Sequence, residues 1–300
     1  MTKDQAKKII QNFCKNKVID IALIEGRGEV NQIFIVTTSK IKYILRVDEN
    51  ENIIDRFQKE AWCAKVANIK GILTPEVFKF DLESGQPYMI ETYIEGINGD
   101  QSTQAEKDKI WRTLGEYARQ SRSIPTKGYG DKMSAPGIFN DSWSRYLEYN
   151  ITSLTPDDKA IKCGAITAKE SKIIKNIFVG LKNIDFEFGL SHYDLSLKNT
   201  IITPAGKVYL LDWGSAQVGP IPHLDISEIL DESLNEKSKQ FKIFLDGYGI
   251  SYDDYKKMKM EITWLELLIN MDKLRWALDK KNDRVNNFSK KIKAVLKKLR

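Results

Sequence analysis

The first 95 residues alternate apolar and polar positions with the two-residue period that is typical of β-strands. A short amphipathic helix is predicted before them, over residues 3–16. A second helix is predicted over residues 51–69, between the third strand and the fourth. The pattern thus predicts an antiparallel sheet of five strands, with short turns joining the first three strands and the last two. The β-rich runs are residues 19–24, 30–38, 41–47, 76–80 and 87–93.

A polar stretch with two glycines, residues 94–99, follows the last of these strands and is predicted to link two lobes. Beyond it the apolar spacing becomes helical, as at Ile110 and Leu114. An irregular loop with prolines and glycines interrupts the helices over residues 124–137. We therefore expect the lobes to divide into residues 1–95 and 96–300.

The last helical segment is basic and amphipathic. Phe288, Ile292, Val295 and Leu299 share one helical face, and lysines occupy the opposite face. A helix of this kind can bind membranes or nucleic acid. More often such a helix packs on its own domain with a solvated basic face, and we favour that interpretation.

Composition places the chain among ordinary globular proteins, because 42% of its 300 residues are hydrophobic and 29% are charged. It contains no apolar run of about 18 residues, the length that crosses a membrane, and it begins without a signal-peptide pattern. Cys14, Cys63 and Cys163 are far apart in the sequence and are predicted to be reduced, mostly buried thiols. We therefore expect a cytoplasmic protein.

The formal net charge of +6 is concentrated at the C-terminal end. Residues 284–300 contain seven Lys or Arg and no acid, so the rest of the chain is close to neutral. Conversely, residues 208–236 contain six acids and no Lys or Arg. Charge therefore predicts neither a nucleic acid nor a membrane as partner.

The polar residues with the most informative spacing lie in LSHYDLSLKNTIITPAGKVYLLDWGSAQVGPIPHLD, residues 190–225. A Pro-Ala-Gly turn joins two strand-like runs into a predicted hairpin. Asn199 and Asp212 flank this hairpin, and Asp194 precedes Asn199 in the same loop. Strand pairing would bring these oxygen donors together, in a set that suits Mg²⁺ beside a nucleotide triphosphate. The spacing also matches a catalytic loop H-x-D-x-x-x-x-N followed by D-x-G.

Two further signals lie in the predicted sheet. Gly26 and Gly28 occupy a turn between strands, where glycines let backbone N–H groups approach phosphate oxygens. An ordinary hairpin turn is the alternative, and it is the favoured one for this turn taken alone. Arg46 is a cation within an apolar strand, and Glu60 on the following helix is its candidate partner. Paired, they would hold a nucleotide phosphate, whereas an unpaired Arg46 would be an exposed edge charge.

Taken together, these segments resemble the aminoglycoside phosphotransferase and choline kinase-like branch of the protein-kinase fold. The resemblance is strongest in HYDLSLKN, LLDWGSA and PHLDISEIL, and it covers about residues 19–278. It implies an α+β fold of two lobes. Residues 1–95 would form a nucleotide-binding N-lobe with an antiparallel five-stranded sheet, and residues 96–300 a mainly helical C-lobe that binds substrate and carries catalysis.

The resemblance also implies roles for single residues of the C-lobe. Asp194 resembles the catalytic aspartate, which orients a substrate hydroxyl and accepts its proton. Asn199 and Asp212 resemble the ligands of Mg²⁺. His192 and Asp225 would support the catalytic loop rather than take protons.

The N-lobe would bind ATP, with GTP not excluded. Phosphates would be held by Arg46 with its partner Glu60, and adenine by backbone groups near Glu91 and Tyr93. The residues expected to bind the nucleotide are thus Gly26, Gly28, Arg46, Glu60, Glu91 and Tyr93. Tyr193 departs from the family pattern, which usually has glycine there, and Trp213 replaces a common phenylalanine.

The expected reaction is transfer of the γ-phosphate to a hydroxyl of a small molecule. A protein kinase is an alternative, but only ten residues separate Gly214 from Asp225, which leaves little room for a peptide-docking segment. A non-catalytic nucleotide-binding module is another, but every catalytic position is filled. A monomer and a homodimer are both compatible with the sequence.

Acidic residues after the catalytic elements suggest a cationic substrate, with an aminoglycoside favoured. They are Asp225, Glu228, Asp231, Glu232 and Glu236, and the last four are the expected substrate residues. A solvated acidic surface is the alternative reading of these acids. Choline-like, sugar and amino-alcohol substrates stay open, as does the choice between antibiotic resistance and metabolism.

Overall fold

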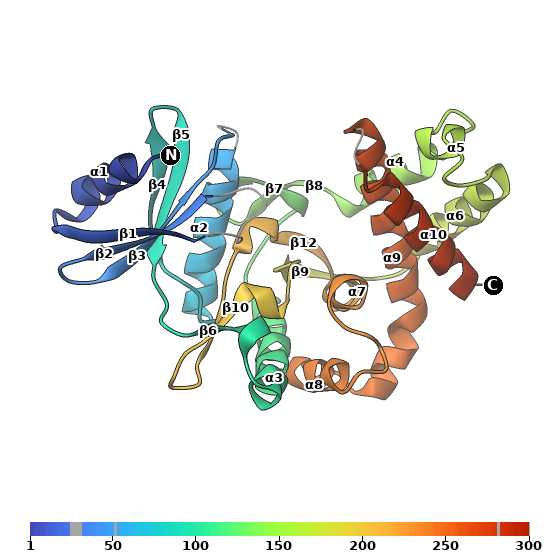
Figure 1. Cartoon of the computed structure of the whole chain (residues 1–300). Coiled ribbons are helices and arrows are strands. Elements are labelled where there is room, and N and C mark those ends of the chain that lie inside the picture. Colours follow the sequence, from blue (N-terminus) through green and yellow to red (C-terminus); the bar gives the residue numbers. More distant parts are fainter. Residues whose placement is uncertain (25–31, 51–52, 281–282, 300) are drawn as a thin grey trace.

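A five-stranded antiparallel sheet forms the centre of the N-terminal lobe, as predicted (Figure 1). The computed structural model describes residues 1–24, 32–50, 53–280 and 283–299. The strand order is β1-β2-β3-β5-β4, and neighbouring strands pair antiparallel throughout. The elements of this lobe are α1 (Lys3–Cys14), β1 (Val18–Ile24), β2 (Gln32–Thr38), β3 (Lys42–Val47), α2 (Ile54–Ile69), β4 (Val77–Glu83) and β5 (Gln86–Thr92).

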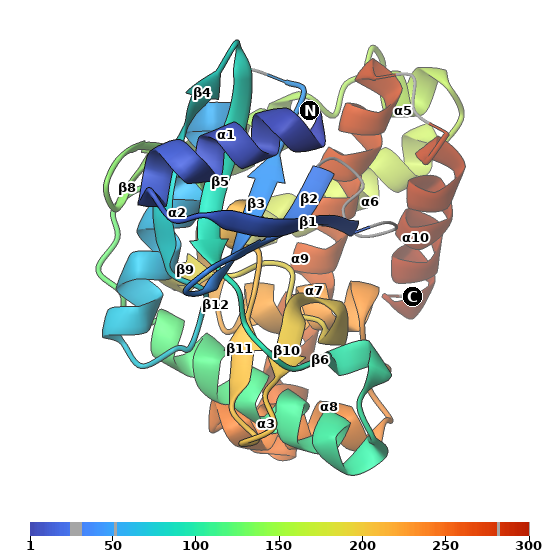
Figure 2. The same cartoon turned by 60° about the vertical axis from the view of Figure 1, so that its left-hand side comes forward.

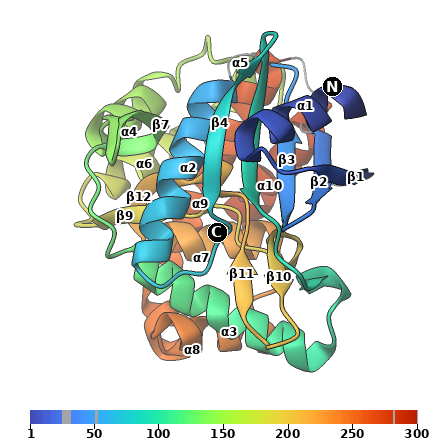
Figure 3. The ribbon, with the colours of Figure 1, turned by 90° about the vertical axis from the view of Figure 1, so that its left-hand side faces the viewer.

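Alternation along β3 gives the sheet two different faces. Tyr43, Leu45 and Val47 point to the face that α1 covers, where they join one buried cluster with residues of that helix. Ile44 and Arg46 point to the opposite face. Figures 1 and 3 show α1 on the outer side of the sheet and α2 on its inner side, toward the second lobe. The inner face is therefore the one that can contact a ligand between the lobes.

The second lobe is mainly helical and contains two small sheets, of orders β11-β10-β6 and β8-β7-β12-β9. Its first elements are β6 (Ile97–Asn98), η2 (Gly99–Gln101), α3 (Gln104–Ser121), β7 (Tyr129–Ala135), β8 (Ile138–Asp141), α4 (Trp143–Thr152), α5 (Lys159–Lys162) and α6 (Ala168–Leu181). Next come β9 (Glu187–Ser191), η3 (Leu197–Asn199), β10 (Thr200–Ile202), β11 (Val208–Leu210), η4 (Trp213–Ser215) and β12 (Gln217–Ile221). The chain then continues through α7 (His223–Glu232), α8 (Lys239–Tyr248), α9 (Tyr252–Asp279) and α10 (Val285–Lys298).

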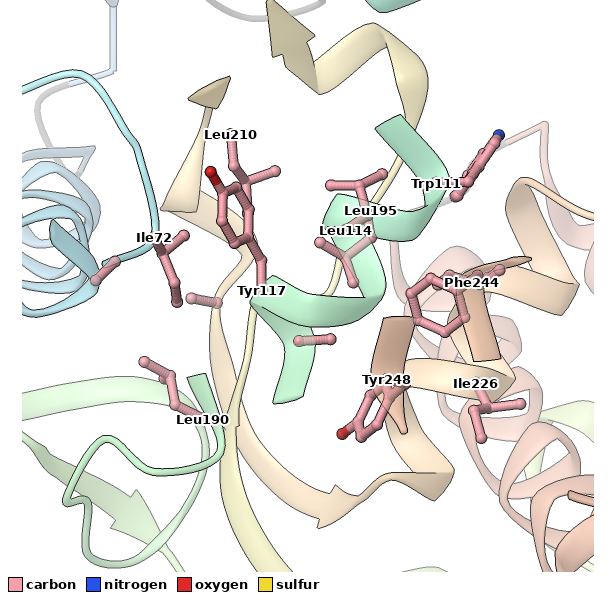
Figure 4. Close-up of a cluster of buried hydrophobic side chains, with 14 of the residues drawn as sticks. Ile72, Trp111, Leu114, Tyr117, Leu190, Leu195, Leu210, Ile226, Phe244 and Tyr248 are labelled. Atoms are coloured by element: carbon pink, nitrogen blue, oxygen red, sulfur yellow. The ribbon is translucent and has the colours of Figure 1, made fainter. Parts of the chain in front are cut away.

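The largest hydrophobic core joins α3 to the segments on either side of it (Figure 4). Leu114 of α3 packs in one buried cluster with Leu195, Leu210 and Phe244. The Tyr117 hydroxyl donates a hydrogen bond to the Val208 carbonyl oxygen at 2.8 Å. Helix α3 thus packs against the β10–β11 hairpin and the loop that precedes it. This packing determines where the polar ends of the two segments lie.

A second core lies at the far end of the lobe, where α10 packs on α9 (Figure 2). Phe288, Ile292 and Val295 are buried there. The apolar stripe of the C-terminal helix therefore packs on its own domain, as the sequence analysis favoured. Within the described residues, no helix is long and apolar enough to span a membrane.

Two segments expected to be irregular are strands. Residues 97–98 form β6, which pairs antiparallel with β10, and the Asn98 side-chain amide also donates hydrogen bonds to the carbonyl oxygens of Lys198 and Thr200 at 2.8 and 3.2 Å. The expected loop at 124–137 contains β7 and leads into β8. The two residues of β6 are too few to show a period, and they form a strand by pairing with the distant β10. The seven residues of β7 do not alternate regularly in burial, and the register of β7 with the neighbouring β8 shifts twice. The expected division after residue 95 falls between β5 and β6, and it stays a prediction.

Candidate active site

Strand pairing brings the catalytic candidates to one end of the β10–β11 hairpin. Thr200 pairs with Leu210 across the hairpin, and the Leu211 N–H donates to the Asn199 carbonyl oxygen at 2.8 Å. Asn199 and Asp212 therefore flank the same pair of strands, as the turn spacing predicted.

The backbone between Asp194 and Asn199 is held in a compact turn. The Asn199 side-chain Nδ2 donates to the Asp194 carbonyl oxygen at 2.9 Å. The Asp194 side chain is 28% exposed, and the Lys198 ammonium lies 3.4 Å from its Oδ1. The carboxylate is thus accessible to a ligand while its backbone is fixed.

Asp212 lies between two arginines. Its Oδ1 is 3.7 Å from Arg46 Nη2 and 3.8 Å from Arg56 Nη2, and it accepts a hydrogen bond from the Gly214 N–H at 3.3 Å. Burial raises the pKa of the Asp212 carboxyl, but Arg46 and Arg56 lower it further, so the net pKa is below its ordinary value. The group is therefore an ionised oxygen ligand at neutral pH.

Arg46 is the centre of a buried charge cluster on the inner face of the sheet. It forms a hydrogen-bonded ion pair with Glu60 of α2, and Glu91 Oε1 lies 3.6 Å from its Nη1. Burial lowers the pKa of Arg46, but Glu60, Glu91 and Asp212 raise it further, so it stays charged. Burial raises the pKa of Glu91 to about 7. The cluster joins the sheet, α2 and the second lobe at one point.

The residues at the hairpin end fit a magnesium ion. Asp212 supplies an ionised carboxylate, and the Asn199 Oδ1 accepts no hydrogen bond within the described part of the chain. Oxygen donors of this kind suit Mg²⁺, which keeps several waters or phosphate oxygens as its other ligands. Among residues 1–24, 32–50, 53–280 and 283–299, no three His, Cys, Asp or Glu side chains form a complete metal cage. The arrangement therefore suits a metal shared with a phosphate ligand.

His192 and Asp225 bind residues next to the loop that holds Asp194 and Asn199. His192 Nε2 lies 2.9 Å from the Leu211 carbonyl oxygen, and burial lowers the pKa of the ring. Asp225 accepts hydrogen bonds from the Ser191 hydroxyl and, at 2.8 Å, from the Tyr248 hydroxyl. A neutral, buried imidazole and a fully bonded carboxyl are suited to support rather than to proton transfer.

The inner face of the sheet offers an apolar surface next to Arg46. Ile35 pairs with Ile44, and Ile33 pairs with Arg46, so these isoleucines share its face, and all three are half-buried. A flat apolar surface beside a cation is suited to a purine with its phosphates. Sequence reasoning did not single out these isoleucines, although their alternation in two adjacent strands could have identified them.

The remaining nucleotide candidates are placed differently. Glu91 lies at the end of β5, and its side chain belongs to the Arg46 cluster. The sequence analysis expected only its backbone groups to take part, by binding adenine. Tyr93 follows β5 and is half-buried, with the Lys42 ammonium 5.1 Å from the centre of its ring. Gly26 and Gly28 lie outside the described residues.

A pocket of about 450 Å³ opens beside Asp194. Two of the four predicted substrate acids, Glu228 and Glu232, line it, whereas Asp231 and Glu236 do not. Its lining residues are Asp100, Trp111, Tyr193, Asp194, Ser196, Leu197, Lys198, Glu228, Glu232, Ser233, Lys273 and Arg284. The lining therefore mixes acids, cations and two aromatic rings.

Most of the predicted substrate acids are already paired with lysines. Asp231 lies 3.2 Å from Lys273 and 2.8 Å from Lys291. Glu232 is shared between the same two lysines, at 3.5 and 3.1 Å, and Glu236 pairs with Lys259. The acidic stretch seen in the sequence is thus largely neutralised by α9 and α10.

Sequence reasoning missed three cations near the site. Arg56 lies one helical turn before Glu60, so the i,i+4 spacing could have identified it as a neighbour of the Arg46 cluster. Lys198 lies four residues after Asp194 in the catalytic loop. Lys273 belongs to α9 and reaches α7 only through tertiary packing, so no local signal could have found it.

A protein-family model described as "Phosphotransferase enzyme family" matches residues 21–260. A curated relative, "Protein LicA homolog" of Metamycoplasma hominis, is 36% identical over 105 residues, which cover 35% of this chain and 39% of that protein. The matched segment thus spans about two fifths of the length of this relative.

Solved structures resemble the whole chain in fold. Aminoglycoside phosphotransferase APH(4)-Ia has a TM-score of 0.71 at 16% identity and 99% coverage of both chains. The GDP complex of aminoglycoside 2'-phosphotransferase-IIIa has a TM-score of 0.71 at 11% identity, with 98% of both chains covered. Choline kinase LicA from Streptococcus pneumoniae has a TM-score of 0.63 at 17% identity, covering 98% of this chain and 97% of that one. These similarities confirm the predicted two-lobed, protein-kinase-like fold.

Proposed function

The chain belongs to the phosphotransferase enzyme family, and from this premise we propose that it transfers the γ-phosphoryl group of ATP to the hydroxyl of a small cationic amino alcohol. One observation carries the proposal. Asp194, Asn199 and Asp212 converge at one end of the β10–β11 hairpin, beside a pocket sized for a small molecule. A phosphotransferase with an alcohol acceptor needs this combination of a base, metal ligands and an acceptor site.

In the proposed mechanism, Asp194 orients the substrate hydroxyl and accepts its proton as the oxygen attacks the γ-phosphorus in line. Asn199 and Asp212 would hold Mg²⁺, which when bound neutralises charge on the triphosphate. Arg46 binds the phosphate oxygens, while Glu60 and Glu91 hold its guanidinium in place. Positioning and electrostatics supply most of the rate in reactions of this class.

The nucleotide is proposed to be ATP, with GTP as the alternative. Structures similar in fold include an APH(4)-Ia variant with ADP, another with AMP-PNP, and the GDP complex of the 2'-phosphotransferase. The apolar inner face formed by Ile33, Ile35 and Ile44 would contact either purine. A direct comparison of kcat/KM for ATP and GTP at saturating acceptor distinguishes the two donors.

The charges around the pocket favour an acceptor with one positive charge over an aminoglycoside with several. Lys273 and Lys291 already neutralise Asp231 and Glu232, and Lys198, Lys273 and Arg284 line the pocket among its acids. A polycation would therefore meet cations as well as acids. Similarity to a protein named as a LicA homolog and to the fold of choline kinase LicA supports the same acceptor class.

The pocket's aromatic rings support the same choice. Trp111 and Tyr193 line it together with Glu228. Aromatic faces attract cations, and a substituted ammonium gains most because it is weakly hydrated. A neutral sugar would use neither the rings nor the acids in this way.

The test is ADP release from ATP and Mg²⁺ with choline, ethanolamine, glucose and hygromycin B as acceptors. We expect stimulation by the two amino alcohols, and stimulation that is weaker by roughly 10²–10⁴-fold with an Asp194→Asn variant. Stimulation by hygromycin B alone would replace the proposed acceptor with an aminoglycoside. ATP binding without turnover on any acceptor across a broad hydroxyl panel would favour a non-catalytic module.

A further inference from the structure

Glu228 differs from the other acids of α7 because its side chain has no hydrogen-bonding or ion-pair partner among the described residues. Asp225 is hydrogen-bonded, and Asp231 and Glu232 are paired with lysines. The Glu228 side chain forms no hydrogen bond or ion pair within the described ranges, its residue is 7% exposed, and its Oε2 is buried without a partner. A carboxyl group in this state is costly to bury, and most of all when it is ionised.

Glu228 is one of the residues that line the acceptor pocket, and the negative charge of Asp194, the proposed base, acts on its carboxyl. The titratable groups that face it are Tyr193 and Asp194 from the catalytic loop, Asp225 and Glu232 from α7, and Lys273 from α9. Lys273, the lysine that lowers the pKa of Glu228, is itself shared with two other carboxylates. Burial, followed by the negative charges of Asp194 and Asp225, raises the pKa of Glu228 to about 8.

We propose that Glu228 receives the positive charge of the acceptor and gives up a proton in exchange. The inference rests on the proposed function, because it concerns the same pocket. In the empty pocket Glu228 is a neutral acid, which avoids a further negative charge beside Asp194. When the cation enters, the carboxyl O–H bond breaks, its proton passes to solvent, and the carboxylate pairs with a cation that keeps its own charge. No covalent bond to the substrate forms, and the net charge of the occupied pocket equals that of the empty one.

Glu228 can release one proton, so it can compensate one positive charge on the acceptor. A second cationic group would meet Lys273 in the same lining, and a neutral acceptor would leave Glu228 protonated and unpartnered. Glu228 is thus a specificity-determining residue that selects singly charged acceptors. Because the cation and the hydroxyl must reach Glu228 and Asp194 in one small pocket, the selected acceptor is a compact amino alcohol.

The experiment is isothermal titration of the full chain with choline, whose charge does not change with pH. Titrations at pH 6, 7 and 8, in buffers of different ionisation enthalpy, give both the affinity and the number of protons released. We expect close to one proton released at pH 6 to 7, and an affinity that rises by up to about tenfold per pH unit until the group is ionised. Glu228→Gln should abolish proton release and make the affinity independent of pH, whereas Glu232→Gln should retain proton release.

Binding without proton release in the wild-type chain overturns the inference, and so does unchanged release in Glu228→Gln. Absence of binding at pH 8 by choline, ethanolamine and tetramethylammonium overturns it as well. The experiments distinguish failure of the inference about Glu228 from failure of the proposed function. Phosphorylation of an amino alcohol without proton release leaves the function standing, whereas proton-linked choline binding without any turnover leaves this inference standing.

The pH dependence of stability tests the inference without a ligand. It is needed if Glu228→Gln binds choline poorly because its structure is disturbed. A carboxyl whose pKa is raised on folding contributes stability below its unfolded value of about 4.5, and that stability is lost as pH rises through about 8. The wild-type chain should therefore lose stability between pH 5 and 8, and Glu228→Gln should lose less over the same range. Parallel pH profiles for the wild type and the variant would contradict a buried, neutral Glu228.

Discussion

Asp194 is a carboxylate with a fixed backbone and an accessible side chain. The Asn199 amide holds its carbonyl oxygen, and its carboxylate faces the pocket next to Lys198. Geometry of this kind suits a group that must meet a substrate hydroxyl repeatedly in one orientation. The role of Asp194 can therefore be tested by removing the charge while keeping the shape.

Asp194→Asn should lower kcat by roughly 10²–10⁴-fold, the usual range for a lost general base, with little change in the KM for ATP. Steady-state ADP release measures both constants. Asp185→Asn, an exposed acid at the end of the α6–β9 connection, is the matched control and should keep wild-type turnover. Turnover near the wild-type value in Asp194→Asn would refute the assignment.

Arg46 offsets the charge of buried carboxylates on two other elements, so its removal should affect folding as well as nucleotide binding. Arg46→Met would leave Glu60 and Glu91 without their cation, and breaking a buried pair in this way costs about 3–5 kcal/mol. Urea unfolding measures the loss, which should be largest at a pH where both acids are ionised. Arg119→Met, on the exposed side of α3, should stay within about 0.5 kcal/mol of the wild type. Equal stability of the two variants would show that the cluster contributes nothing.

At the scale of elements, α3 and α8 cross so closely that only glycine fits at the contact. A Cβ atom on Gly115 would lie 2.2 Å from the Phe244 carbonyl oxygen. The crossing matters for the site because α8 also carries Tyr248, whose hydroxyl donates to Asp225. The packing of two helices thus determines where a buried supporting hydrogen bond lies.

Gly115→Ala should therefore destabilise the chain by about 1–3 kcal/mol, since the helices must separate to admit the methyl group. Thermal and urea unfolding measure the effect, and kcat should fall with it if the contact between Tyr248 and Asp225 is disturbed. Thr113→Ala, on the same helix but less buried, is the control. An unchanged melting temperature in Gly115→Ala would mean that the crossing is looser than described.

At the scale of the whole molecule, the proposed nucleotide site draws on both lobes. Arg46 comes from the N-terminal sheet, and Asp212 comes from the end of the β10–β11 hairpin. A ligand that contacts both should stabilise the complete chain rather than one lobe, and by about 2.7 kcal/mol at a hundredfold excess over Kd.

We expect ADP with Mg²⁺ to raise the melting temperature more than ADP with a chelator. Differential scanning calorimetry gives both values. In Asp212→Asn, the additional rise in melting temperature that depends on Mg²⁺ should disappear. The rise caused by ADP alone should remain, because Arg46 and the apolar face of the sheet are unchanged. If Mg²⁺ raised the melting temperature of the ADP-bound variant as much as that of the ADP-bound wild type, Asp212 would be excluded as a metal ligand.

The sequence by itself determined the strands of the N-terminal sheet and the hairpin that carries Asn199 and Asp212. Strand alternation predicted the five-stranded sheet, and the turn between residues 202 and 208 predicted that Asn199 and Asp212 would meet. The alternation within each strand and the hairpin turn depend on neighbours within a few residues, where periodicity and turn geometry constrain the chain strongly. The roles assigned to Asp194, Asn199 and Asp212 stay predictions, as does the division after residue 95.

Only the tertiary structure decided which charges remain available to a substrate. The acids after Asp212 read as one acidic surface in the sequence, but Lys273 and Lys291 approach them from helices more than 40 residues further along the chain. The two-residue strand β6 likewise forms through pairing with the distant β10. Pairing at long sequence separation depends on the packing of whole elements, and no local pattern records it. The same packing leaves Glu228 without a hydrogen-bonding or ion-pair partner among the described residues.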